Sequence, residues 1–330
     1  MTRRAASLSV VLLLVLAVSA CNRDQVMDVP AIAARTENAP KKLKDAIAFF
    51  TRQFNTTDGG LAVMNVDGSD RRALPGGELG FEPSISRDGR RIAFSRNTDV
   101  GVTSVYVMNV DGTGTTEVAH GLVLNPGPVW SPDGCRIAFR SFVDFGGGPT
   151  GRISIVNADG TGLHQVTPDG DPNNSPFDES PTWSPDGTRL AFTRNSVLHV
   201  INVDGTGLAA LPNEDMALNP SWSPDGQRIA YTSLDPFGEI RLRNPDGSNL
   251  ARVTTASPEN GIFDFWPRWA PDSRQLVSAH IAGDQIQTVT INIDGTNPVN
   301  LTPAGVLDFM PDWSPRTSDI EFEGTGKCAF

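Results

Sequence analysis

The sequence predicts an all-β protein, a six-bladed β-propeller built from four-stranded antiparallel blades. The chain of 330 residues contains 32 glycines and 25 prolines, a higher share of turn-forming residues than helical proteins carry. Two turn motifs alternate along it, and each returns at intervals of 39 to 53 residues, close to the length of one propeller blade. Each motif occurs six times, so we expect six blades.

The first motif joins the innermost strand of a blade, strand A, to the next strand, strand B. Its full form is W-S-P-D-G-x-R-hydrophobic-A-F, in which proline presets φ, aspartate accepts hydrogen bonds from nearby amides and glycine tolerates positive φ. Copies, some of them degenerate, begin at Ile85, Trp130, Trp183, Trp222, Trp269 and Trp313. We expect the aromatic residue to pack between blades and the motif's arginine to pair with the turn aspartates. These arginines are Arg91, Arg136, Arg189 and Arg228.

The second motif, hydrophobic-x-hydrophobic-N-x-D-G-[ST], predicts the hairpin between strands C and D. Its asparagines are Asn65, Asn109, Asn157, Asn202, Asn244 and Asn292. The hairpin Leu61–Leu74 precedes the first complete blade, and the segment Asp312–Phe322 follows the last one. We expect these two pieces to share one blade, with strands A and B from the C-terminus and strands C and D from the N-terminus, which leaves no free sheet edge. The propeller would then span residues 59–323, with a tail at residues 324–330.

The first twenty residues have the pattern of an export signal. Basic residues precede an apolar run from Leu8 to Val18, which is too short to span a bilayer and ends in Val18-Ser19-Ala20-Cys21. This order is similar to the lipobox of bacterial lipoproteins, which implies cleavage after residue 20 and acyl chains such as palmitate on Cys21. Asn22 then implies the periplasmic face of the outer membrane. An ordinary signal peptide with a cysteine there by chance is the alternative.

Residues 21–58 differ in composition from the repeats, and we expect them to form a tether between the membrane and the propeller. One short helix is expected within it, because Leu43, Ile47, Phe50 and Phe54 recur at helical spacing.

The two turn motifs together resemble the propeller repeat of the TolB-like family, over residues 59–323. The resemblance implies a periplasmic scaffold that binds envelope proteins. The family's namesake also carries a separate N-terminal α/β domain, whereas fewer than forty residues separate Cys21 from the first expected strand, so we do not expect TolB itself. Enzymes similar to prolyl oligopeptidase share the repeat, but the G-x-S-x-G nucleophile motif of their hydrolase domain is absent from the sequence.

The formal net charge of −11 disfavours a nucleic-acid partner. Most of the acidic excess comes from aspartates of the turn motifs, so the charge by itself identifies no partner. We expect a monomer.

Strand alternation points to one candidate site. If the tryptophan of strand A points between blades, residues one, three and five positions before it face the central channel. On this reasoning Arg268 and Asp312 form an ion pair across neighbouring blades. Further carboxylates would face one end of the channel and bind Ca²⁺ or a basic peptide, and a water-filled acidic mouth without a ligand is the alternative. These carboxylates are Glu82, Asp178, Asp264 and Asp308.

Two classes of function remain open. A membrane-tethered binding module would hold an envelope protein or peptide at the face of the B–C and D–A loops. A hydrolase of the six-bladed lactonase or esterase type would use channel-bound Ca²⁺ as a Lewis acid, although the sequence offers no evident general base. The sequence favours binding, with Ca²⁺ in the channel mouth as the one cofactor considered.

We expect Cys135 and Cys328 to remain unbonded. Cys135 lies at an A–B turn, whereas the expected closing strand B would carry the chain to the opposite face before Cys328. A disulfide requires Cα atoms within about 7 Å of each other.

Overall fold

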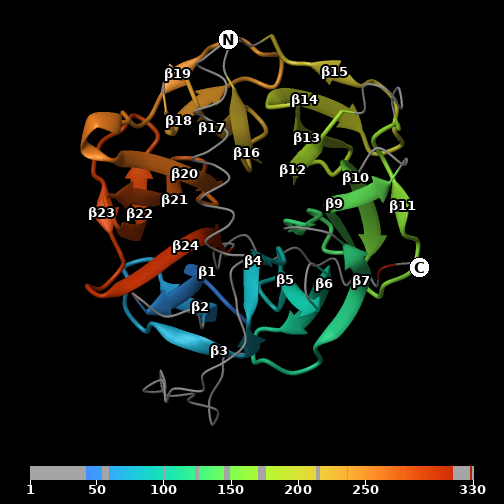
Figure 1. Cartoon of the computed structure of the whole chain (residues 1–330), viewed down its shortest axis with the longest axis horizontal. Coiled ribbons are helices and arrows are strands. Elements are labelled where there is room, and N and C mark those ends of the chain that lie inside the picture. Colours follow the sequence, from blue (N-terminus) through green and yellow to red (C-terminus); the bar gives the residue numbers. More distant parts are fainter. Residues whose placement is uncertain are drawn as a thin grey trace.

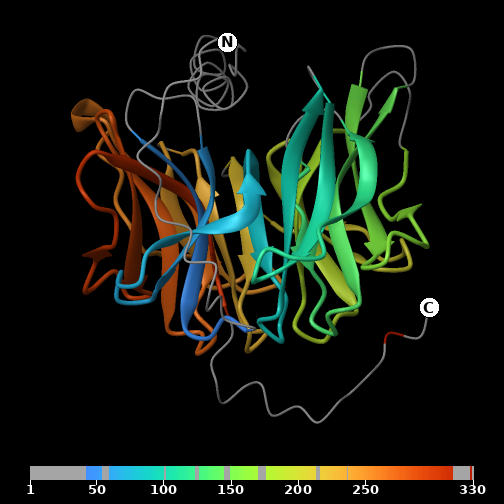
Figure 2. The same ribbon diagram turned by 90° about the horizontal axis from the view of Figure 1, so that it is seen from below.

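The computed structural model describes residues 42–53, 59–99, 102–122, 126–144, 149–169, 176–212, 216–235, 237–314 and 328. Within these residues, six four-stranded antiparallel sheets form a ring of blades, as the sequence predicts (Figure 1). Strand A of each blade lies nearest the axis of the ring and strand D at its rim. Seen from the side, the ring is a thick disc with turns on both faces (Figure 2).

The blades follow one another around the ring in chain order, and each runs from strand A to strand D. The first contains β24 (Val306–Trp313), β1 (Ala46–Gln53), β2 (Gly59–Asn65) and β3 (Arg72–Glu78), and the second contains β4 (Gly80–Ile85), β5 (Arg91–Asp99), β6 (Val102–Asn109) and β7 (Thr116–Leu122). The third contains β8 (Val129–Trp130), β9 (Arg136–Asp144), β10 (Pro149–Asn157) and β11 (His164–Gln165), and the fourth contains β12 (Asp178–Trp183), β13 (Arg189–Arg194), β14 (Val197–Asn202) and β15 (Ala209–Ala210). The fifth contains β16 (Ala217–Trp222), β17 (Ile229–Ser233), β18 (Glu239–Arg243) and β19 (Ala251–Arg252). The sixth contains β20 (Ile262–Trp269), β21 (Gln275–Ala282), β22 (Gln285–Asn292) and β23 (Val299–Asn300), preceded by the short helix η2 (Pro258–Asn260).

The ring closes through one blade shared by both ends of the chain, but its strands are divided differently from the expectation. β24 supplies strand A, whereas β1, β2 and β3 supply strands B, C and D. β1 pairs with β24 on one side and with β2 on the other, so it occupies the place expected for a C-terminal strand B. The segment expected to form that strand, residues 315–322, lies outside the described residues.

Strand β1 also replaces the helix expected near residues 41–54, so the propeller begins at Ala46 and not at residue 59. Ile47, Ala48 and Phe49 are all completely buried, because β1 is an inner strand covered on both faces. A short, continuously apolar run is typical of such a strand, but periodicity alone does not distinguish it from a buried helix.

The hydrophobic core is divided among the interfaces between blades. Val105 and Val107 of the second blade, for example, pack with Trp130, Ile137 and Phe139 of the third. Because neighbouring blades cover both faces of each sheet, Phe139 is completely buried. Burial of one such side chain contributes roughly 1.5–3 kcal/mol, so the ring is held together mainly by these interfaces.

The C–D turn motif is held by local hydrogen bonds that recur in all six copies. In one copy Asp159 Oδ1 accepts bonds from the Thr161 N–H (2.9 Å) and hydroxyl (2.7 Å), and Asn157 Nδ2 donates to the same hydroxyl oxygen at 3.0 Å. Gly160 takes a φ of 87°, which residues other than glycine rarely adopt. The same three bonds recur in the other copies.

The aspartate of the A–B turn is engaged in a similar way. Asp186 Oδ1 accepts bonds from the Ser184 hydroxyl at 2.6 Å and from the Thr188 N–H at 3.0 Å. The hydrogen bond from Ser184 contributes most, and together these bonds lower the pKa of Asp186 to about 2. The carboxylate is therefore ionised at neutral pH and already has partners within its own turn.

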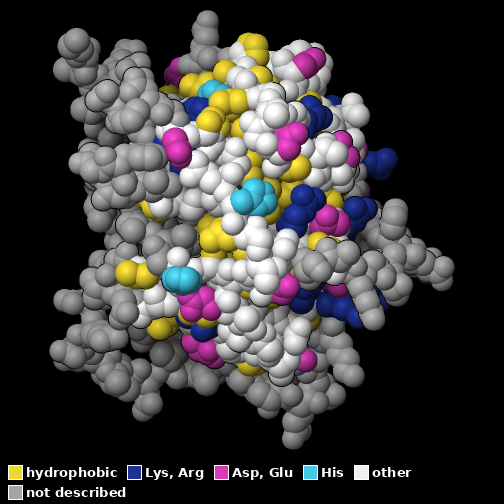
Figure 3. Space-filling model, turned by 90° about the vertical axis from the view of Figure 1, so that its right-hand side faces the viewer, with side chains coloured by type: hydrophobic (Ala, Val, Ile, Leu, Met, Phe, Trp, Pro, Cys, Tyr) yellow, Lys and Arg dark blue, Asp and Glu magenta, His cyan; other side chains and the backbone are white. Residues whose placement is uncertain are grey.

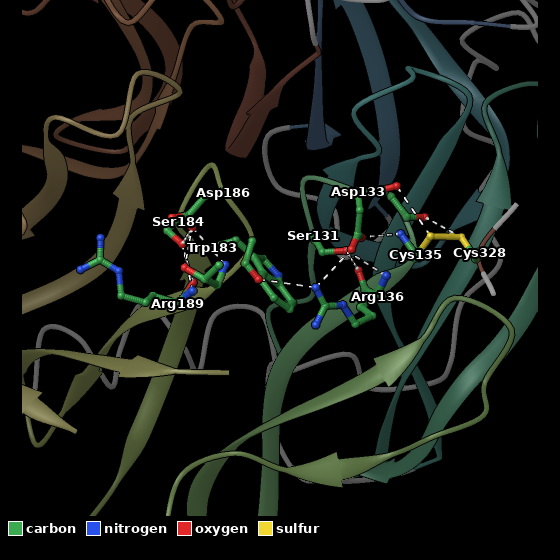
Figure 4. Close-up of polar contacts among 12 residues, drawn as sticks. Ser131, Asp133, Cys135, Arg136, Trp183, Ser184, Asp186, Arg189 and Cys328 are labelled. Carbon is green, nitrogen blue, oxygen red and sulfur yellow. Dashed lines mark hydrogen bonds and ion pairs between the residues drawn. A yellow bond between two sulfur atoms is a disulfide. The ribbon is translucent and has the colours of Figure 1, made fainter. Parts of the chain in front are cut away.

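The arginines of this motif join neighbouring blades, which corrects the expectation that they pair chiefly with turn aspartates. Three of them stack on the tryptophan of the next blade, with 4.5–5.0 Å between guanidinium carbon and ring centre. The pairs are Arg91 on Trp130, Arg136 on Trp183 and Arg189 on Trp222. Arg91 also donates to the carbonyl of Gly134 at 2.7 Å. In one copy the expected ion pair forms as well, with Arg136 Nη2 3.1 Å from Asp133 Oδ2 (Figure 4).

A disulfide joins Cys135 to Cys328, so the expectation that these cysteines remain unbonded is wrong (Figure 4). Their Cα atoms are 5.5 Å apart. The reason is the closing blade: because β1 supplies strand B, β24 ends at the A–B face, where the Ser314 N–H bonds to the Ala46 carbonyl at 2.8 Å. Residues 315–327 separate Ser314 from Cys328, and a chain of that length spans up to about 40 Å. Ser314 and Cys135 therefore lie on the same face of the disc, within reach of a segment of that length.

Candidate functional site

The central channel opens at the face of the A–B turns as a cavity of about 800 Å³. The last residues of each strand A and the turns that follow form its walls. Five of the six tryptophans of the chain line it, namely Trp130, Trp183, Trp222, Trp269 and Trp313. Turn prolines of four blades complete the apolar part of the wall, namely Pro132, Pro185, Pro224 and Pro271. A volume of this size is typical of small-molecule sites.

The residue one position before the aromatic lines the cavity in every blade, as strand alternation predicts. These residues are Ser84, Val129, Thr182, Ser221, Arg268 and Asp312. Two of them also join blades: Ser84 Oγ accepts a bond from the Trp130 N–H at 3.2 Å, and Thr182 Oγ1 accepts one from the Trp222 N–H at 3.1 Å.

The predicted ion pair between Arg268 and Asp312 is present in this ring. Arg268 Nε lies 4.0 Å from Asp312 Oδ1, and Asp312 Oδ2 accepts a hydrogen bond from the Ile85 N–H at 2.7 Å. Burial raises the pKa of Asp312 to about 6, an effect that the charge of Arg268 opposes only in part. Burial also lowers the pKa of Arg268.

Strand alternation breaks three positions before the first residue of the A–B motif, where the backbone has a φ of 50–55° in all six blades. The residues there are Glu82, Gly127, Ser180, Asn219, Trp266 and Met310. In the ladder between β4 and β5, Phe81 pairs with Ser95 and Ser84 pairs with Ala93. Three steps on strand A therefore oppose two steps on strand B, which defines a β-bulge. The bulge reverses which side chains face the channel beyond it.

The bulge moves the carboxylates five positions before the aromatic to the sheet face that carries the tryptophan. They lie buried between blades, and each has a basic partner. The closest contacts are Arg194 Nε to Asp178 Oδ1 at 2.6 Å, His280 Nδ1 to Asp264 Oδ1 at 2.9 Å, and Arg71 Nη1 to Asp308 Oδ2 at 2.6 Å. The hydrogen bond that His280 donates to Asp264 raises the pKa of His280.

Glu82, the remaining carboxylate predicted as a metal ligand, lies in a bulge. Its Oε2 accepts bonds from the Ser95 hydroxyl and the Gly127 N–H, both at 2.8 Å, and burial raises its pKa. Within the described ranges, no three His, Cys, Asp or Glu side chains gather closely enough to hold one metal ion. The geometry therefore does not bring the four predicted calcium ligands together.

One charged pair is not foreseen by strand alternation. Glu179 lies four positions before Trp183, and the bulge places it on the same sheet face as Thr182. Its Oε2 is 3.2 Å from Arg140 Nη1, and burial raises its pKa against the opposing charge of Arg140. The charge of Arg140 also acts on Glu82, so these groups form one network. Without the bulge, simple alternation would place Glu179 on the opposite face.

Comparison with known proteins shows what the propeller is similar to. Residues 44–197 match the family model described as the TolB beta propeller domain. The ring is a TolB-like propeller. A TolB homologue of Chlorobium luteolum is 30% identical over 265 residues, which cover 74% of this chain and 58% of the homologue. The chain thus spans less than two-thirds of this relative.

Solved structures show the same TolB-like fold. TolB from Acinetobacter baumannii superposes with a TM-score of 0.69 at 18% identity, covering 85% of this chain and 69% of that one. A putative TolB from Agrobacterium tumefaciens gives a TM-score of 0.58 at 18% identity, covering 82% of this chain and 98% of that one. At these identities the likeness concerns the fold alone.

On the side shown in Figure 3, acidic and basic side chains of the TolB-like propeller are interspersed where the surface is described. This agrees with the origin of the negative charge in the turn motifs. In the part of the chain that the structure describes, no helix has the length and apolar character needed to cross a membrane.

Proposed function

We propose that this TolB-like propeller is a membrane-tethered scaffold of the bacterial envelope that binds a protein or peptide at the face of its B–C and D–A loops. The proposal rests mainly on the closed ring, which has the TolB-type fold. Because the ring resembles periplasmic scaffold proteins, we expect the partner to be an envelope protein or peptide.

Two features support an exported, tethered protein. The disulfide between Cys135 and Cys328 is of the kind that persists in oxidising compartments such as the periplasm. Cys21, which lies outside the described residues, ends the lipobox-like sequence.

The contact of the segment before β1 indicates which face of the disc a partner can reach. The Leu43 N–H bonds to the carbonyl of Gly89, in an A–B turn, at 2.6 Å. The tether therefore joins the disc at its A–B face, which leaves the opposite face for a partner.

That opposite face carries two exposed apolar side chains in its connections. Leu79, between β3 and β4, is 55% exposed, and Phe237, between β17 and β18, is 47% exposed. Large apolar and aromatic side chains are typical anchors in the centre of protein interfaces. We therefore expect both residues to contact the partner.

Site-specific photo-crosslinking in the native envelope tests this surface. A crosslinking amino acid at Leu79 and one at Phe237 should capture the same protein, identified by mass spectrometry. Leu250, 54% exposed in a C–D turn on the A–B face, is the matched control and should not capture it. Capture from Leu250 but from neither of the other two positions would contradict the proposed face.

The anchor is tested separately by Cys21→Ser. Without the thiol that carries the acyl chain, the protein should move from the membrane pellet to the soluble envelope fraction. A variant that stays in the pellet after a high-salt wash would show that the lipobox interpretation is wrong.

A further inference from the structure

We propose that the channel mouth at the A–B face binds a small zwitterionic ligand with an ammonium and a carboxylate on one carbon, as in a free α-amino acid. This site lies on the disc face opposite the proposed partner surface and does not rest on it. The proposal follows from the charges, hydroxyls and apolar walls of the cavity.

Arg268 supplies the group for the carboxylate. A guanidinium has five N–H donors, and within the described residues Arg268 uses one of them, for the Pro267 carbonyl at 3.0 Å. Its Nε is 4.0 Å from Asp312, beyond hydrogen-bond distance. The side chain is 25% exposed and lines the cavity, so its remaining donors can bind a carboxylate through paired hydrogen bonds.

Asp312 supplies the group for the ammonium. Its side chain is 17% exposed on the cavity wall. Asp312 Oδ1 lies 4.0 Å from Arg268 Nε, so a positive and a negative group stand side by side, as the two charges of an α-amino acid do. A simple anion would be repelled by Asp312, and a simple cation would be repelled by Arg268. A ligand that carries both charges satisfies both residues, which is why we specify a zwitterion.

The neighbouring residues complement the rest of such a ligand. The oxygens of Ser84 and Thr182 accept backbone bonds, and in the described part of the chain neither hydroxyl donates one, so both protons remain for a ligand oxygen. Tryptophan and proline side chains form the outer wall, which favours an apolar side chain on the ligand. The cavity is large enough to hold an aromatic one.

Titration of the wild-type protein with three related compounds tests the proposal. L-Phenylalanine, N-acetyl-L-phenylalanine and L-phenylalaninamide are added separately, and binding is followed by calorimetry and by tryptophan fluorescence, because five tryptophans line the cavity. The free amino acid should bind saturably, and each derivative, which lacks one charge, should bind at least tenfold more weakly. Absence of saturable binding up to about 10 mM, or equal binding of the N-acetyl derivative, would overturn the proposal.

Variants locate the site. Arg268→Gln and Asp312→Asn should each weaken L-phenylalanine binding at least tenfold, whereas Arg274→Gln, at an exposed arginine of the adjacent turn, should leave it unchanged. Equal loss in all three variants would place the ligand elsewhere and overturn the assignment. Because the three compounds are compared on the wild type, the test does not depend on the variants folding.

Discussion

Asp312→Asn tests how the charges of the channel act on stability. Burial raises the pKa of Asp312 from 3.8 to about 6 in the folded protein, so the folded state holds this proton more tightly than the unfolded chain does. The stabilisation from the protonated carboxyl is therefore fully present below pH 3.8 and is lost as the pH rises through 6.

The size of the effect follows from the shift. Each pKa unit corresponds to 1.36 kcal/mol, so a shift of about two units amounts to about 3 kcal/mol as an upper bound. Asparagine does not titrate and still offers an oxygen to the Ile85 N–H. Arg268 stays charged in both proteins, so the cost of burying it cancels when the two pH profiles are compared.

Urea unfolding followed by tryptophan fluorescence at a series of pH values between about 4 and 7.5 measures this difference. Relative to Asp312→Asn, the wild type should lose up to about 3 kcal/mol of unfolding free energy across that interval. Parallel profiles for the two proteins would refute the reasoning, because they would mean that Asp312 ionises at its ordinary pKa.

Other features of the fold give further expectations. Cys328→Ser should lower the free energy of unfolding by up to about 5 kcal/mol, because the disulfide closes a long loop in the unfolded chain, and equal urea midpoints for the variant and the oxidised wild type would contradict this. Phe49→Ala, in the middle of β1, should cost about 3–5 kcal/mol in the same assay, whereas a cost below about 1 kcal/mol would show that β1 is not part of the folded ring. Calcium should leave the melting temperature unchanged, since Asp264 and Asp308 already have basic partners. A calcium-dependent rise that is lost in the double variant Asp264→Asn, Asp308→Asn would restore the calcium site.

The repeat and the ring at the channel mouth could be predicted because both depend on local chemistry. Turns need proline, aspartate and glycine at fixed positions, so every copy is visible in the sequence. Residues such as Arg268 lie one position before an aromatic whose direction the packing fixes, and no irregularity intervenes.

The deeper channel was not predicted, because strand alternation alone takes no account of the bulge. The bulge has one sequence signal: a proline follows the bulge residue in all six copies, and within sheets proline is found at edge strands and bulges. Glu82, Ser180 and Met310 are not residue types that favour positive φ, so the fold imposes this conformation on them. Alternation therefore fails beyond that point: Asp178 lies on the sheet face that carries Trp183, and Glu179 lies on the face that carries Thr182.

The disulfide could not be predicted for a related reason. The run from Ala46 to Phe50 is equally apolar as a helix or as a strand, and only its place in the closing blade decides between them. If β1 is taken for a helix, the C-terminal segment must supply strand B. The chain end is then expected on the face opposite Cys135, too far away for Cys328 to bond to it.

The position of β1 also determines how the molecule would carry mechanical load. A pull on the segment before Leu43 acts along β1, which is antiparallel to both β2 and β24. The two ladders would then be loaded in shear, so that their hydrogen bonds resist together and do not open one after another. Forced unfolding depends on the barrier to unfolding and not on equilibrium stability. Because the bond between Cys135 and Cys328 secures the chain beyond β24, the ring would resist tension at its closing blade from both ends of the chain.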